Sequence, residues 1–104
     1  MYKLNIFETN FNLILYRDTY VATGGLSITA YTDEGEPFSD ITKCLPNAPV
    51  VLDEDLAFID TNNNPWLVEF LEENNIAYYT GASTTLGFVE YPLYKFDLTK
   101  LEEE

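Results

Sequence analysis

The sequence predicts an α+β domain, in which a mostly antiparallel sheet of about five strands has one α-helix, over about residues 65–75, packed on one face. Three observations lead to this class. Apolar residues mostly alternate with polar ones, which is the period of a half-buried strand. A single segment has apolar residues at helical spacing. The chain has 104 residues, a usual size for one folding unit, so we expect one domain over residues 1–104.

The N-terminal segment over residues 5–16 is rich in Phe, Ile and Leu, and it is interrupted near Thr9-Asn10. Its composition predicts strand structure. Gly24-Gly25 comes before a predicted strand rather than a helix, so it does not suit a phosphate-binding loop. We expect the two glycines to let the chain bend into the hairpin, or to allow a bulge.

A β-hairpin is predicted over residues 25–45. Residues 26–31 alternate between apolar and polar side chains. Residues 33–36 have the sequence Asp-Glu-Gly-Glu, in which the glycine can take the positive φ of a tight turn. We therefore expect residues 38–45 to form the returning strand. After it, residues 46–49 (Pro-Asn-Ala-Pro) suit a loop.

A short strand is predicted next, either near Val50-Val51 or over residues 56–59. The helix follows, with Asn64 as a suitable N-cap and Pro65 at the first helical position. Asn74-Asn75 can end it in the left-handed conformation. Four residues at helical spacing predict its buried face: Trp66, Leu67, Phe70 and Leu71.

The C-terminal third predicts two more strands. Residues 76–80 suit a strand, and residues 81–87 suit a flexible polar loop. Residues 88–98 alternate again, and Pro92 predicts that this strand lies at an edge or carries a bulge. We expect residues 101–104 to be a frayed acidic tail.

Charge is the property that most restricts the function. Asp and Glu number 18, Lys and Arg number 5, and histidine is absent, which gives a formal net charge of -13 at pH 7. With 46% hydrophobic and 15% aromatic residues, the chain can still form a core. Such a compact polyanion repels nucleic acid and anionic membranes, and it attracts proteins that have basic clefts. We therefore expect no direct nucleic-acid binding and no membrane partner.

Catalysis is not expected, because most of its usual groups are missing. Without histidine there is no Ser–His or Cys–His pair. Cys44, in the predicted returning strand, is interpreted as a small buried hydrophobe. Asp53-Glu54-Asp55 is the best calcium candidate, but it lacks the glycine and the acid order of an EF-hand loop and reads better as a solvated turn. We expect no metal site, no cofactor and no enzyme activity.

The sequence also predicts a compartment. Residues 1–6 lack the basic and apolar regions of a signal peptide. The chain has no apolar run as long as a membrane span. Cys44 has no second cysteine to pair with, which suits a reducing environment. We expect a cytoplasmic protein.

Tyrosine is more abundant than a core of this size requires, with 8 residues. Exposed tyrosines suit protein interfaces, because each contributes a large area and a hydroxyl. The alternative is cross-strand pairing on the second face of the sheet. The two interpretations concern Tyr16, Tyr20, Tyr31, Tyr78, Tyr79, Tyr91 and Tyr94.

Clustered acids suggest DNA mimicry. Residues two apart on a strand lie about 6–7 Å apart on one face, and DNA carries one charge per about 3.4 Å of axis on each strand. Rows of carboxylates could thus imitate a phosphate backbone, although surface acids can also serve solubility alone. The candidate partner-binding residues are the hairpin acids Asp33, Glu34, Glu36 and Asp40, the helix acids Glu69, Glu72 and Glu73, and Tyr31.

Several segments resemble a family of small, acidic, functionally unassigned proteins carried by phages, plasmids and conjugative elements of Firmicutes. The similarity covers roughly residues 20–98. The segments that carry it are Tyr20–Ile28, Gly35–Phe38, Leu56–Asp60, Trp66–Ile76 and Gly87–Pro92. None of them is a catalytic motif, and the resemblance provides no active-site residues.

The resemblance implies a setting in which anti-CRISPR and antirestriction proteins occur, some of which mimic DNA. We therefore expect an inhibitor that binds a bacterial DNA-targeting nuclease with a basic cleft, such as a type II CRISPR effector or a restriction enzyme, and blocks its DNA binding. The alternative is a non-catalytic accessory or assembly module that acts through a Tyr-rich homodimer or partner interface.

Overall fold

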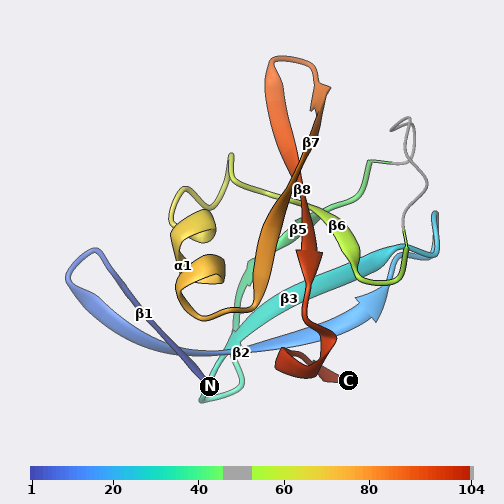
Figure 1. Cartoon of the computed structure of the whole chain (residues 1–104). Coiled ribbons are helices and arrows are strands. Elements are labelled where there is room, and N and C mark those ends of the chain that lie inside the picture. Colours follow the sequence, from blue (N-terminus) through green and yellow to red (C-terminus); the bar gives the residue numbers. More distant parts are fainter. Residues whose placement is uncertain (46–52, 104) are drawn as a thin grey trace.

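The structure is a computed structural model that describes residues 1–45 and 53–103, which form two β-sheets and one short α-helix (Figure 1). The first sheet contains β1 (Tyr2–Ile6), β2 (Thr9–Thr19), β3 (Leu26–Thr32), β4 (Pro37–Asp40) and β9 (Glu102–Glu103). The second contains β5 (Thr42–Lys43), β6 (Leu56–Ile59), β7 (Ala77–Leu86) and β8 (Val89–Phe96). The helical segments are α1 (Leu67–Glu73) and the 3-10 turn η1 (Leu98–Lys100). The predicted α+β class, mostly antiparallel with one α-helix, is confirmed; the difference is that the chain forms a second, four-stranded sheet beside the five-stranded one.

The first sheet has the strand order β1-β2-β3-β4 and is antiparallel along this path. Its first turn is Phe7-Glu8, where both residues have positive φ, so the interruption predicted near Thr9-Asn10 lies two residues earlier. The predicted turn over residues 33–36 is confirmed, and so is the bend at Gly24-Gly25. The inward face of the sheet contributes Leu4, Leu13, Leu15, Leu26, Ile28 and Ala30 to the main core.

The returning strand predicted over residues 38–45 is divided between the two sheets. β4 pairs with β3, whereas β5 pairs with β6. The buried residue Ile41 lies between them: its N–H donates to the Ile28 carbonyl (2.9 Å), and its own carbonyl accepts from the Asp60 N–H (2.9 Å). The prediction of one hairpin over residues 25–45 is therefore wrong, because local alternation does not reveal that a strand changes partner.

The helix is shorter than predicted and lacks the expected side-chain cap. Trp66 is the N-cap residue, and no side chain bonds to the free N–H groups. The amide of Asn64 instead donates to the carbonyls of Asp40 (2.8 Å) and Asp60 (3.1 Å), so it is committed to the ends of β4 and β6. At the other end Asn75 has a φ of 55°, which confirms the predicted left-handed ending.

β7 and β8 form a long hairpin that projects from the rest of the fold (Figure 1). The flexible polar loop predicted over residues 81–87 is mostly strand, and the turn is only Gly87-Phe88. Gly87 has a φ of 63° at the first central position, as a type II′ turn requires. β8 is not an edge strand, because its residues 93–95 pair with β6 as well as with β7, and Pro92 lies just before these residues and pairs with β7. Its partner Ser83 borders a register irregularity, which agrees with the predicted bulge.

The C-terminal residues are not a frayed tail up to residue 103. Leu101 is buried in the main core. Glu102 and Glu103 pair in parallel with Tyr16 and Arg17 of β2, and Arg17 forms an ion pair with Glu103. The prediction is wrong because a tertiary contact across most of the chain holds a segment whose local sequence suggests disorder.

Of the two strands considered before the helix, residues 56–59 form β6, while the loop predicted at residues 46–49 and the alternative strand at Val50-Val51 lie outside the described residues. Cys44 lies just beyond β5 and is half-buried, so the expectation of a buried position is only partly met. In the described part of the chain, no helix is long and apolar enough to cross a membrane.

Candidate functional site

Three of the hairpin acids lie in the turn between β3 and β4, whereas Asp40 lies at the far end of β4, and all four are exposed. The Thr32 N–H donates to the Glu36 carbonyl (2.9 Å), and the Gly35 N–H donates to the Thr32 carbonyl (2.9 Å). Gly35 has a φ of 83°, which few other residues adopt without strain. The turn is also tied to β2, because the Asp33 N–H donates to the Asn12 carbonyl (3.0 Å). Backbone bonds therefore fix the main chain of the turn, while the carboxylates that it carries stay exposed.

A shallow pocket of about 350 Å³ lies beside this turn, on the face of the first sheet that points away from the core. Tyr16 and Tyr31, on adjacent strands, contact each other at right angles, with ring centroids 5.4 Å apart. Ile14 is the direct cross-strand neighbour of Tyr31. We call this the tyrosine pocket, and its lining residues are Ile14, Tyr16, Tyr31, Thr32, Asp33 and Gly35.

The tyrosine pocket joins an apolar surface to a carboxylate. Tyr31 and Asp33 were predicted as site residues, and the structure brings them together. Ile14 was not predicted, and Tyr16 was recognised only as one of many tyrosines. Alternation along β2 places Ile14 and Tyr16 on one face, but the register that sets them beside Tyr31 has no local signal.

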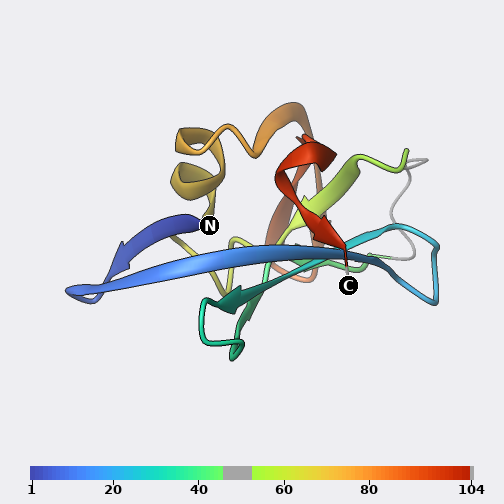
Figure 2. The same ribbon diagram turned by 90° about the horizontal axis from the view of Figure 1, so that it is seen from below.

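The helix acids do not join the hairpin acids. Figure 2 shows α1 on one side of the first sheet and the 33–36 turn on the other. Glu69 and Glu73 line a pocket of about 320 Å³ between α1 and β1, which also includes Lys3. The structure therefore divides the predicted acidic residues into two separate surfaces.

Glu72 is set apart even from the other helix acids. Its carboxylate accepts a hydrogen bond from the hydroxyl of Tyr94 (3.0 Å), a residue that is buried as a whole. Burial, followed by this hydrogen bond and the negative charge of Glu72, raises the pKa of Tyr94 to about 12. Part of the hydrogen-bonding capacity of Glu72 is thus used within the fold.

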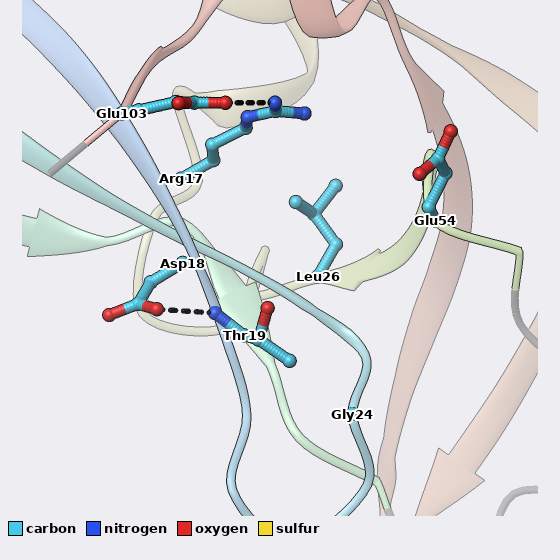
Figure 3. Close-up of a pocket in the computed structure, with 7 residues that line it drawn as sticks. All are labelled: Arg17, Asp18, Thr19, Gly24, Leu26, Glu54 and Glu103. Carbon is cyan, nitrogen blue, oxygen red and sulfur yellow. Dashed lines mark hydrogen bonds and ion pairs between the residues drawn. The ribbon is translucent and has the colours of Figure 1, made fainter.

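A pocket of about 420 Å³ lies where the C-terminal strand meets the end of β2 (Figure 3). Arg17 and Glu103 lie on one side of it and Glu54 on the other, with Leu26 between them. The Asp18 carboxylate turns back to accept from the Thr19 N–H (2.7 Å). Sequence reasoning missed this pocket, because Arg17 and Glu103 are separated by nearly the whole chain. Its one guanidinium is already paired with a carboxylate.

The candidate calcium segment, Asp53-Glu54-Asp55, is an exposed to half-buried turn in which Asp55 forms an ion pair with Lys95 (3.7 Å). Over residues 1–45 and 53–103, no group of three or more Asp, Glu or Cys side chains is placed to hold a metal ion. The arrangement around the tyrosine pocket instead suits non-covalent binding of a cationic side chain, with the rings and the carboxylate acting together.

A family model described as a domain of unknown function (DUF4313) matches residues 14–104. This match confirms the resemblance to a functionally unassigned family over most of the chain. It includes the tyrosine pocket and all the hairpin acids and helix acids, and it leaves out β1. No curated protein and no solved structure matches the chain.

Proposed function

We propose that this chain, which belongs to the DUF4313 family of domains of unknown function, is an anti-defence inhibitor of a bacterial DNA-targeting nuclease. It acts in the cytoplasm, on behalf of a phage, plasmid or conjugative element. It binds the basic cleft of a type II CRISPR effector or a restriction enzyme and prevents DNA from entering. The observation that carries the proposal is the group of exposed hairpin acids, of which Asp33 lines the tyrosine pocket, on a molecule with a net charge of -13.

The charge supports this proposal through both the rate and the stability of binding. A field of this sign speeds the approach to a Lys- and Arg-lined cleft, and it excludes nucleic acid as a partner. In the cleft, carboxylates take the positions of phosphates and displace the same counterions. Charge alone gives little discrimination among basic surfaces, so a specific inhibitor also needs an anchor.

The tyrosine pocket supplies that anchor in the proposed complex. A guanidinium from the cleft can stack against a tyrosine ring and bond to the Asp33 carboxylate at the same time. Arginine fits this role better than lysine, because its planar group stacks and forms two parallel hydrogen bonds. Exposed acids around the pocket would then contact further basic residues.

Neutralising the hairpin acids tests the proposal. The variant combines Asp33→Asn, Glu34→Gln, Glu36→Gln and Asp40→Asn. Inhibition of DNA binding by a type II CRISPR effector and by a restriction enzyme is measured by electrophoretic mobility shift at several salt concentrations. We expect the inhibitory potency to fall by about tenfold or more, and the potency of the unmodified protein to fall steeply as salt rises.

A matched control removes the same number of negative charges elsewhere, through Asp53→Asn, Glu54→Gln, Glu90→Gln and Glu102→Gln. The inhibitory potency of this control should fall only about threefold. Its net charge changes by the same amount as that of the test variant, but the proposed contact surface stays intact. A second control, Glu69→Gln with Glu73→Gln, tests the surface on the other side of the first sheet. Equal losses in all variants would contradict a specific acidic surface, and absence of inhibition of both nucleases would contradict the function.

A further inference from the structure

The second sheet ends at a long strand with an open edge. In the described residues β7 is hydrogen-bonded on one side only, to β8. It has 10 residues, and those from Tyr78 to Leu86 are exposed except for half-buried Thr84. Figure 1 shows the outer part of this strand standing away from the other elements. Free N–H and C=O groups along such an edge can pair with another strand.

The other edge strands carry features that prevent such pairing. β4 has 4 residues, begins with Pro37, ends with Asp40 and has a register shift against β3. β5 has 2 residues, and β9 consists of two glutamates. β1 carries Lys3 on its outward face. Short length, proline, bulges and charge are the devices that natural proteins use to protect edges.

β7 lacks proline and charge. Its sequence, AYYTGASTTL, contains neither, and its register irregularity lies between Tyr79 and Ser83, which leaves Ser83–Leu86 regular. In the whole segment over residues 77–94, Glu90 is the one charged residue, although the chain has a net charge of -13. Exposed Leu86 and Phe88 add an apolar tip. Two copies of the chain repel each other over most of their surfaces but not here.

We infer that β7 pairs with β7 of a second copy, antiparallel about a two-fold axis. The two four-stranded sheets would then form one continuous sheet of eight strands. Leu86 and Val89 flank a two-residue turn and are therefore a hydrogen-bonded pair, so the alternation of an antiparallel ladder directs the N–H and C=O groups of Ser83 and Thr85 outward. A second copy fits this edge because it presents the same neutral, regular strand. This inference does not depend on the proposed function, since the hairpin acids belong to the first sheet.

Molar mass as a function of protein concentration tests the inference, by sedimentation equilibrium from about 1 μM to about 500 μM. We expect the mass to rise from 11.9 kDa towards twice that value. The double variant Ser83→Asp with Thr85→Asp should stay monomeric where the unmodified protein dimerises, because like charges then face each other across the new pair of strands. Added salt should partly restore its dimer. The matched control, Thr9→Asp with Asn10→Asp, adds the same charge to another exposed strand and should dimerise.

Hydrogen exchange on the unmodified protein provides a measurement that needs no variant. The Ser83 and Thr85 amides should exchange several-fold more slowly at high protein concentration than at low concentration, whereas the exchange of exposed Thr9 should not change. A mass of 11.9 kDa at every concentration would overturn the inference. A dimer with unchanged Ser83 and Thr85 exchange, or one that both aspartates leave intact, would place the contact elsewhere and overturn it as well.

Discussion

Asn64 shows how a single buried residue supports an exposed surface. Its side chain is only 3% exposed and bonds to three partners at the junction of β4, β6 and the helix. It donates to the carbonyls of Asp40 and Asp60, and its own oxygen accepts from the Ser39 hydroxyl. Because Asp40 is one of the hairpin acids, the main chain beneath that carboxylate is fixed from the core side. Asn64 is thus a structural residue whose effect reaches the candidate site.

Tyr94 makes the stability of the protein sensitive to alkaline pH. Its pKa is raised to about 12 in the folded protein, above the usual value of 10, because burial and Glu72 both favour the neutral phenol. The stabilisation of the folded state that goes with this raised pKa is fully present below pH 10, where the phenol is neutral in both the folded and the unfolded chain. That contribution is lost between pH 10 and about 12, at about 1.4 kcal/mol per pH unit for a single proton.

We expect the Tyr94→Phe variant to lack this loss, so that its free energy of unfolding falls less steeply than that of the unmodified protein over the same pH range. Chemical denaturation at successive pH values measures the difference. Glu72→Gln should lower the tyrosine pKa seen by ultraviolet titration, since one hydrogen bond and one charge interaction are changed. Tyr78→Phe, at an exposed tyrosine of β7, is the control. Parallel pH curves for Tyr94→Phe and the unmodified protein would contradict this account.

Among the elements, the first hairpin has a turn that its residues do not favour. Phe7 and Glu8 have φ values of 53° and 61°, in the left-handed region. Non-glycine residues there cost about 1–2 kcal/mol each, and turns with two positive φ values favour Asn-Gly. The double variant Phe7→Asn with Glu8→Gly should therefore raise the free energy of unfolding by about 1–2 kcal/mol. Urea denaturation checks this, and Gly87→Ala, at a φ of 63°, should have the opposite effect.

An element could be predicted from the sequence where a few neighbouring residues determine it, but not where contacts between distant segments determine it. The turn at Gly35 and the helix end at Asn75 follow from one or two residues, and both were predicted correctly. The division of residues 38–45 between two sheets was not, because it depends on the bonds of Ile41 to Ile28 and Asp60. The same is true of the tyrosine pocket, where the carboxylate was visible in the sequence but the register of Ile14 beside Tyr31 was not.

At the scale of the whole molecule, charge repulsion opposes the compact state. The described residues contain two ion pairs, Arg17–Glu103 and Lys95–Asp55, against a net charge of -13. The radius of gyration is 13.1 Å, and the screening length falls from about 30 Å at 0.01 M salt to about 8 Å at 0.15 M. Most of the repulsion is therefore felt at low salt and screened at moderate salt.

We expect NaCl to stabilise the protein over this range. The melting temperature should rise by roughly 4–8 °C between 0.01 M and 0.15 M, which corresponds to about 1 kcal/mol for a domain of this size. Differential scanning calorimetry at fixed pH gives the measurement. The neutralised variants described above should show a smaller rise. A melting temperature that falls with salt would mean that attractive surface pairs outweigh the repulsion.

Ile41 has a consequence for how the molecule comes apart. Its N–H donates to the carbonyl of Ile28 in the first sheet, and its carbonyl accepts from the N–H of Asp60, which directly follows β6 of the second sheet. Its side chain is fully buried in the core that the two sheets share. Because Ile41 connects the two sheets through both its main-chain bonds and its buried side chain, we expect the two layers to unfold together as a single cooperative unit despite their separate hydrogen-bonding networks.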